Sequence, residues 1–151
     1  MEALIDFLDI DSRSRRIATE IWPLIEPRMG DLIDAFYAGV GPFTVEPERT
    51  AQTVEHLKTT HTRHWKNLFE SRFDEDYFRS ASLIGIQHYE MGLHSKWHVV
   101  GYARMKNELS AELFRARLPR NSKAQAITTL NKYLALDMAI SLSSYTCILI
   151  E

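Results

Sequence analysis

Hydrophobic positions recur with a period near 3.6 residues along most of the chain, and no stretch alternates with period two for long. Short breaks rich in Gly, Pro, Asp and Ser separate these stretches, so the pattern predicts an all-α protein. A short amphipathic segment, EALIDFL, opens the chain, and a helix stop is expected at Gly92 in the left-handed conformation. The longer helices are expected to begin near Ser12, Pro27, Pro47, Glu75, Ser95 and Lys123.

Several of these boundaries depend on particular residues. Asp11 and Asp74 are of the type that caps a helix N-terminus, and Ser95 is expected to do the same for the helix that runs to about Leu118. Pro119, Asn121 and Ser122 are expected to form the turn before the last helix. No repeat or linker divides the chain, which predicts a single domain over residues 1–151.

Composition narrows the class of protein. The chain has 151 residues, of which 45% are hydrophobic and 25% charged, as in ordinary globular domains. A formal net charge of −2 argues against a nucleic-acid-binding protein. The single cysteine, Cys147, excludes an intramolecular disulfide and is expected to be an inert helix residue. The acidic opening segment does not resemble a signal peptide and no apolar run is long enough to span a membrane, so we expect a cytoplasmic protein.

Histidines are the candidate ligand residues. His61 and His64 are three residues apart and His94 and His98 four apart, so each pair shares one helical face and could bind zinc or copper. No carboxylate or cysteine completes either pair at a recognisable spacing. Partly exposed helical histidines are therefore the simpler interpretation of both pairs.

His88 differs because it belongs to an apolar stripe with Ala81, Ile84 and Met91. A lone histidine in such a stripe is more often a hydrogen-bonded core residue than a ligand. A ligand role would require apolar pocket walls, one imidazole on a haem iron and a donor for bound gas on the opposite side.

Several stretches resemble the sensor globin domain of the globin-coupled sensors, a protoglobin-like family. The most specific is IGIQHYEMGL followed by KWHVVGY, and the resemblance covers about residues 12–145 in the same order. The stretches are FYAGV (36–40), HWKNLF (64–69), FDEDY (73–77), IGIQHYEMGL (84–93), KWHVVGY (96–102) and LNKYLALDMA (130–139). The resemblance implies a globin fold of the 3-over-3 type, with an extra short N-terminal helix and a reduced or missing D helix.

The resemblance also implies roles for particular residues. His88 matches the proximal ligand of haem iron, and Tyr37 matches the distal tyrosine that donates to bound oxygen. Leu57 and Thr60 match positions on the distal helix that face the ligand. The remaining candidates for the haem pocket, each of which also fits a plain core position, are Phe36, His61, Trp65, Leu68, Phe69, Ile84, Met91 and Trp97.

Three residues depart from the family pattern. Ser95 stands where the family usually has Pro, His98 where it usually has Tyr, and Ser71 where it often has Gly. None of them replaces His88 or Tyr37. His98 either takes over the hydrogen bond of the tyrosine that it replaces or changes gas affinity and signalling.

The function implied by the resemblance is sensing of a diatomic gas, O₂ first and CO or NO as alternatives, through haem b. It also implies a homodimer through helices 95–118 and 123–150, and an output module outside these residues, most consistent with a chemotaxis transducer, although a diguanylate cyclase is a further option. Gas binding is expected to move His88 and, through the Gly92 turn, to bias the packing of residues 95–118.

Two other functions stay open. One is a haem-free globin-like interaction module in a stress-signalling assembly, for which His88 and Tyr37 would have no use. The other is a single-domain globin with nitric oxide dioxygenase-type activity, which would need a reductant. No flavin or nicotinamide motif is present in the sequence, so a sensor rather than an enzyme is the favoured interpretation.

Overall fold

The computed structural model describes residues 1–40, 42 and 47–150, except the side chains of 47–54 and 145–150. Every regular element in this part of the chain is a helix, as the hydrophobic period predicted. The expectation for Cys147 falls outside the described side chains. The elements are α1 (Glu2–Phe7), α2 (Ser12–Ile25), η1 (Glu26–Arg28), α3 (Met29–Val40), α4 (Pro47–Phe69), α5 (Glu75–Glu90), α6 (Ser95–Arg115) and α7 (Arg120–Ile150).

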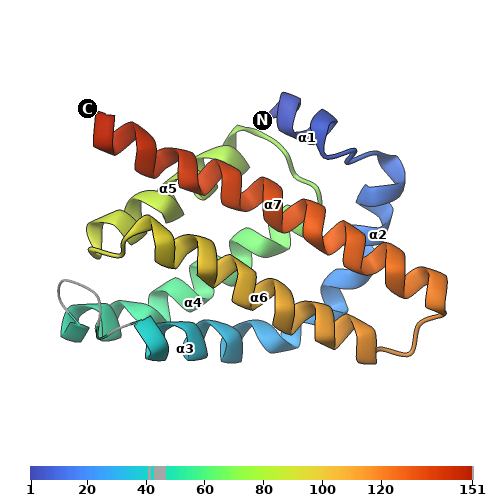
Figure 1. Cartoon of the computed structure of the whole chain (residues 1–151), viewed down its shortest axis with the longest axis horizontal. Helices are drawn as coiled ribbons and strands as arrows, with labels where there is room; N and C mark the ends of the chain where they lie inside the picture. The colour runs from blue at the N-terminus through green and yellow to red at the C-terminus, as the bar shows by residue number, and fades with distance from the viewer. Residues whose placement is uncertain (41, 43–46, 151) are drawn as a thin grey trace.

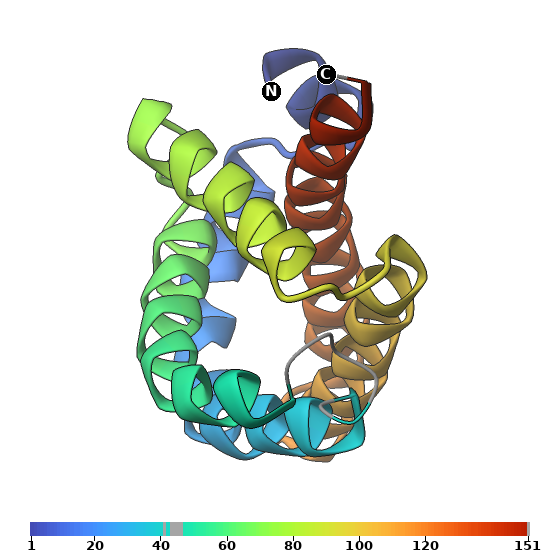
Figure 2. The same cartoon turned by 90° about the vertical axis from the view of Figure 1, so that its left-hand side faces the viewer.

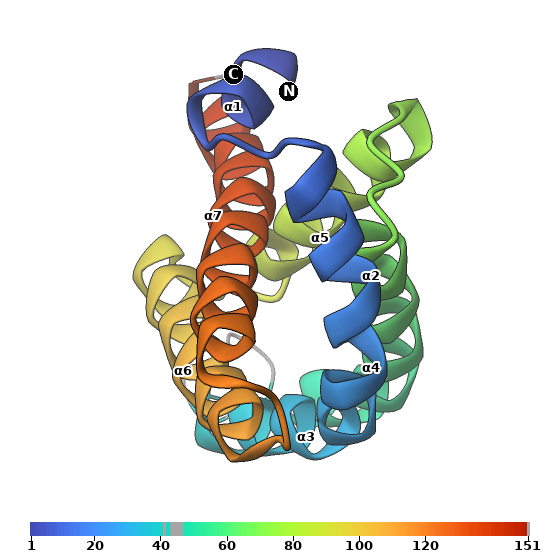
Figure 3. The same cartoon turned by 90° about the vertical axis from the view of Figure 1, so that its right-hand side faces the viewer.

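The longest helix, α7, organises the fold. It packs most extensively on α5 and α6, and also on α2 (Figure 1). The two end-on views show α3 crossing one end of the molecule, while α1 and the C-terminal end of α7 lie together at the other (Figures 2 and 3). No helix in the described part of the chain carries an apolar stretch long enough to cross a bilayer.

Local chemistry explains most helix ends. The side chain of Asp11 accepts a hydrogen bond from the amide of Ser14 at 2.8 Å, and Asp74 accepts from the amide of Tyr77 at 2.9 Å. Each bond satisfies one of the free N–H groups at a helix start. Gly92 has φ 72° and ends the segment after α5 in the left-handed region, as predicted.

Two predicted boundaries were wrong. His94, not Ser95, is the N-cap of α6, because its backbone is extended and its Nδ1 accepts from the amide of Lys96 at 3.2 Å. The turn before α7 is also shorter than predicted. The carbonyl of Pro119 already accepts from the amide of Lys123, so Asn121 and Ser122 lie in the first turn of α7.

The apolar core lies between α2, α4 and α7. Phe69 is fully buried and stacks on Tyr133 of α7, with ring centroids 5.5 Å apart, and on Trp22 of α2, at 5.8 Å. Trp22 is therefore a core residue, as expected. Leu130 and Leu136 of α7 are also fully buried. α7 is therefore the central helix on which the others pack.

Candidate functional site

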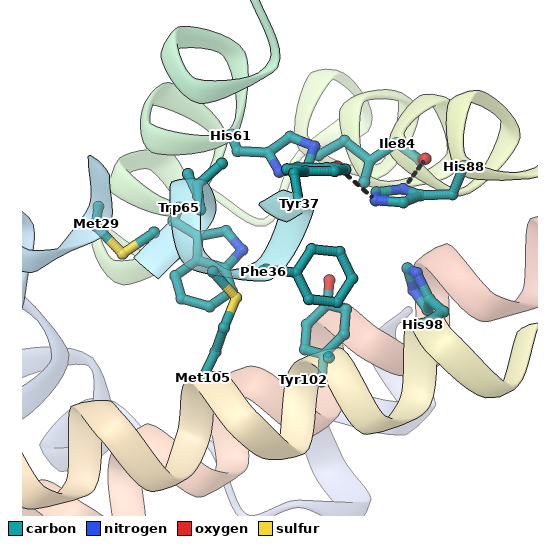
Figure 4. Close-up of a pocket in the computed structure, with 12 residues that line it drawn as sticks. Met29, Phe36, Tyr37, His61, Trp65, Ile84, His88, His98, Tyr102 and Met105 are labelled. Carbon is teal, nitrogen blue, oxygen red and sulfur yellow. Dashed lines mark hydrogen bonds between the residues drawn. The ribbon is translucent and has the colours of Figure 1, made fainter. Parts of the chain in front are cut away.

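A small cavity lies between α3, α4, α5 and α6 (Figure 4). With the side chains in these positions, the cavity volume is about 40 Å³, which is room for one or a few water molecules. Its walls are mostly apolar, and five imidazole or phenol rings reach it. The lining residues are Met29, Ile33, Phe36, Tyr37, His61, Trp65, Ile84, His88, His98, Gly101, Tyr102 and Met105.

His88 presents one ring nitrogen to this cavity. It is buried on α5, and its Nδ1 lies 2.7 Å from the carbonyl oxygen of Ile84, one turn earlier. A carbonyl only accepts, so Nδ1 carries the proton and Nε2 carries the lone pair. Burial lowers the pKa of His88, although the bond to Ile84 acts in the opposite direction. The ring is therefore a neutral imidazole with its basic nitrogen turned inward.

Tyr37 of α3 points to that nitrogen. Its hydroxyl oxygen lies 2.8 Å from Nε2 of His88, and the two rings stack with an interplanar angle of 13° (Figure 4). Since Nε2 is the acceptor, the phenol O–H is the donor. The sequence could not give the orientation of Tyr37, and the structure places its hydroxyl inside the cavity.

His61 of α4 supplies a second imidazole. Its ring centroid lies 5.6 Å from that of His88 and 6.5 Å from that of Tyr37. Its Nε2 is buried and has no hydrogen-bond partner among the described residues. Burial, followed by the proximity of His88 and His64, lowers the pKa of His61 to about 3. An unpaired buried nitrogen costs about 1–3 kcal/mol, so a hydrogen-bond or coordination partner for Nε2 of His61 would stabilise the domain.

α6 forms the wall opposite α4. His98 is buried there, with its Nε2 2.7 Å from the hydroxyl of Ser141 on α7, and burial lowers its pKa to about 3. Its ring meets that of His88 edge-on at 5.2 Å. The close approach of Phe36 requires Gly101, since a Cβ there would overlap the Phe36 ring.

A buried carboxylate on α7 holds side chains from three other helices around the cavity. Asp137 accepts from His64 and Tyr102 at 2.6 Å each and from Trp65 at 3.2 Å. The hydroxyl of Tyr77 donates to it as well, at 2.6 Å. Burial opposes ionisation, but His64 and these hydrogen bonds outweigh it and hold the pKa of Asp137 at about 2. Asp137 thereby ties α4, α5 and α6 to α7.

The structure brings together half of the residues predicted for the site. Those that line the cavity are Phe36, Tyr37, His61, Trp65, Ile84 and His88. The others lie outside its lining: Leu57, Thr60, Leu68, Phe69, Met91 and Trp97. Thr60 donates to the carbonyl of His56 at 2.9 Å, and Leu57 is buried one turn before His61. On α4, His61 and Trp65 rather than Leu57 and Thr60 reach the cavity.

Sequence reasoning left out four residues of the α6 wall as site members: His98, Gly101, Tyr102 and Met105. His98 was singled out only as a departure from the family pattern. Tyr102 lies four residues after His98 and therefore on the same face of the helix. This spacing could have indicated that both residues reach the same site. Met29 and Ile33 were expected as core residues and also reach the cavity.

The two histidine pairs do not form metal sites in the described part of the chain. His64 is bound to Asp137, while His61 faces the cavity. His94 is exposed, while His98 is buried. No three His, Cys, Asp or Glu side chains among the described residues are grouped to hold a metal ion by themselves. Coordination through His88 or His61 would thus need further ligands from a prosthetic group.

Known proteins share both the architecture and the sequence pattern. The solved globin domain of the Geobacter sulfurreducens globin-coupled sensor matches with a TM-score of 0.77 and 21% identity, over 96% of this chain and 97% of that one. At this identity the match shows the fold, which is the globin fold, as predicted. The Protoglobin family model matches residues 1–147. The chain belongs to the Protoglobin family.

Membership of this family indicates how the short first helix and the cavity are to be interpreted. In this protoglobin, α1 is the short N-terminal helix that the resemblance implied. The expectation of a reduced or missing D helix falls on residues 41–46, of which only residue 42 is described, so it stays a prediction. The cavity, with His88 on α5 and Tyr37 on α3, is the candidate prosthetic-group site of the domain.

Proposed function

We propose that this protoglobin domain binds haem b through His88 and senses a diatomic gas, O₂ first and CO or NO as alternatives. The observation that carries the proposal is the fixed tautomer of His88. Its Nδ1–H donates to Ile84, so Nε2 offers its lone pair to an apolar cavity. Metal-bound histidines commonly have their second nitrogen held in this way.

The residues present fit haem in their chemistry. His88 and His61 are both neutral, as iron ligands must be. Apolar side chains such as Phe36, Ile84 and Met105 match the face of a porphyrin. In its present volume the cavity holds only water-sized molecules, so haem would require the Tyr37–His88 bond to open and the rings to separate.

When bound, haem supplies the iron that coordinates the gas. The contribution of the chain is to position donors around it. Tyr37 carries the O–H group nearest to Nε2 of His88, and a hydrogen bond from it to a polarised diatomic ligand would be worth roughly 1–3 kcal/mol. Apolar neighbours exclude water, which strengthens that bond.

We further propose that His61 competes with the gas for iron. Its unpaired Nε2 lies in the same cavity as Nε2 of His88 but belongs to the facing helix α4. A second imidazole ligand would satisfy this nitrogen. Gas binding would then require His61 to leave, which makes the affinity of the domain dependent on the position of α4.

The dimer and the output module remain proposals as well. On α6, Val100 and Phe114 are 52% and 66% exposed and lie nearly four turns apart on one face, which supports a partner on this helix. On α7, Leu130 and Leu134 are buried in the domain's own core, whereas Met138 and Leu142, which continue the same spacing of four residues, are partly accessible. We propose a homodimer through helices 95–118 and 123–150, with a chemotaxis-type output beyond these residues.

A haem titration tests the central proposal. The wild type is expected to give one equivalent of bound haem with a Soret band. His88→Ala is expected to lose the band or to bind haem at least tenfold more weakly, while the exposed His56→Ala control behaves as wild type. Equal haem binding by wild type and His88→Ala would exclude His88 as the ligand. A wild type without a Soret band would favour the haem-free interaction module.

A further inference from the structure

α5 and α7 touch directly at Gly85, next to the residue that holds His88. A Cβ at Gly85 would overlap both the hydroxyl of Ser144 and the carbonyl oxygen of Ser141. The two backbones are therefore in contact at this point, and α5 cannot move along α7 there without displacing it. Ile84, whose carbonyl fixes the His88 ring, is the preceding residue.

A second contact from His88 ends at the same residue of α7. The ring of His98 lies edge-on to His88 at 5.2 Å, and its Nε2 lies 2.7 Å from the hydroxyl of Ser141. The same hydroxyl also lies 2.9 Å from the carbonyl oxygen of Asp137, one turn earlier on α7. Ser141 therefore joins the His98 ring to the backbone of α7.

Ser141 lies one turn after Asp137, the residue that anchors α7 to three other helices. Asp137, one turn earlier, is bound to side chains from α4, α5 and α6 and cannot shift easily. Ser141 is 1% exposed and is the next residue of α7 in contact with the His88 region. A displacement that reaches Ser141 is thus expected to affect the helix after it more than the helix before it.

We propose that Ser141 passes a displacement of His88 to the part of α7 that follows it, residues 142–150. The inference rests on the proposed gas-binding function and identifies the helix that receives the signal. To the route expected from the sequence, which ran through Gly92 to residues 95–118, it adds a direct contact between the His88 region and α7. Two contacts support the new route, one through the main chain at Gly85 and one through the His98 ring.

Hydrogen exchange of the haem-loaded protein with and without CO tests this route. In the wild type, CO is expected to change the exchange rates of peptides within 139–150 by about threefold or more, because α7 loosens or tightens locally. Ser141→Ala removes the contact with His98 but keeps the main-chain contact at Gly85, so it is expected to reduce this change. Ser143→Ala is the matched control, since its hydroxyl makes the same kind of bond, to Ala139 at 2.7 Å, on the exposed face of α7.

Each outcome decides between specific alternatives. A CO-induced Soret shift without any change in α7 would overturn the inference and leave the proposed function intact. Equal responses in Ser141→Ala and Ser143→Ala would also overturn it. A wild type without a Soret band would overturn the proposed function, and the inference with it. Should Ser141→Ala fail to fold, His98→Phe removes the same hydrogen bond and is expected to reduce the response as well.

Discussion

The hydroxyl of Tyr37 donates to the same nitrogen of His88 that we propose as the iron ligand, over 2.8 Å. The two residues are 51 positions apart and belong to α3 and α5. The bond is buried, so it is not weakened by competition with water. Any metal that takes Nε2 must first displace the phenol, and this competition gives Tyr37 two opposite effects.

Tyr37→Phe is expected to strengthen haem binding and to weaken gas binding. Removing the O–H abolishes a hydrogen bond of about 0.5–1.5 kcal/mol that competes for Nε2, so haem affinity rises roughly two- to tenfold. The same change removes the donor to the gas, so O₂ is released about five- to a hundredfold faster. Haem titration and stopped-flow O₂ release measure the two effects. Weaker haem binding with unchanged O₂ release would contradict this account of Tyr37.

His61→Leu tests the second imidazole. If His61 binds iron, the ferric wild type is six-coordinate and low-spin, and the variant becomes largely five-coordinate or water-bound and high-spin. Absorption and electron paramagnetic resonance spectra distinguish these forms. His56→Leu, an exposed change on the same helix, should leave the spin state unaltered. A high-spin wild type would show that His61 does not bind the iron.

The stability of the haem-free protein is expected to fall between pH 7.5 and pH 5. Burial lowers the pKa of both His61 and His98 from 6.5 to about 3. Below pH 6.5 the unfolded chain therefore binds protons that the folded chain does not, and stability falls until about pH 3. The loss by pH 5 is on the order of 1–2 kcal/mol for each histidine.

Urea denaturation at several pH values measures this loss. His61→Leu should reduce the slope, because one of the buried histidines no longer titrates in the unfolded state. Asp137 acts in a separate window, since its lowered pKa contributes stability that is lost only below about pH 4. Equal stability at pH 7.5 and pH 5 would contradict the buried, neutral state of both rings.

Asp137→Asn is expected to destabilise the fold by about 2–4 kcal/mol, because an amide cannot accept from every donor that the carboxylate serves. The amide would also place N–H groups against the donors of His64 and Tyr102. Asp31→Asn, on the exposed surface, is the control and should change stability by less than about 0.5 kcal/mol. A loss of less than 1 kcal/mol in Asp137→Asn would show that the network is not a major source of stability.

The helices and several of their ends could be predicted from the sequence because they depend on nearby residues. Asp11, Asp74 and Gly92 act on their own helix ends, so their roles follow from residue type and spacing. The start of α7 was missed by three residues. Asn121 and Ser122 are residue types common in turns, but the carbonyl of Pro119 already accepts from the amide of Lys123, so the helix includes them.

The candidate site could be predicted only in part because its residues meet through tertiary packing. Asp137 appears in the sequence as one polar residue in the apolar run LALDMA, with no sign of its partner His64, 73 residues earlier. His61 resembled an ordinary helical histidine until the structure showed its unpaired nitrogen beside His88. The roles of His88 and Tyr37 came from the family resemblance, and the structure adds their direct contact.

The most direct test of the account is the absorption spectrum of the reduced, haem-loaded wild type before and after addition of O₂ and of CO. The account predicts a Soret band that shifts with each gas and returns when the gas is removed. The same shifts should be absent in His88→Ala and retained in His56→Ala. A haem band that does not respond to any diatomic gas would contradict the proposed sensing function.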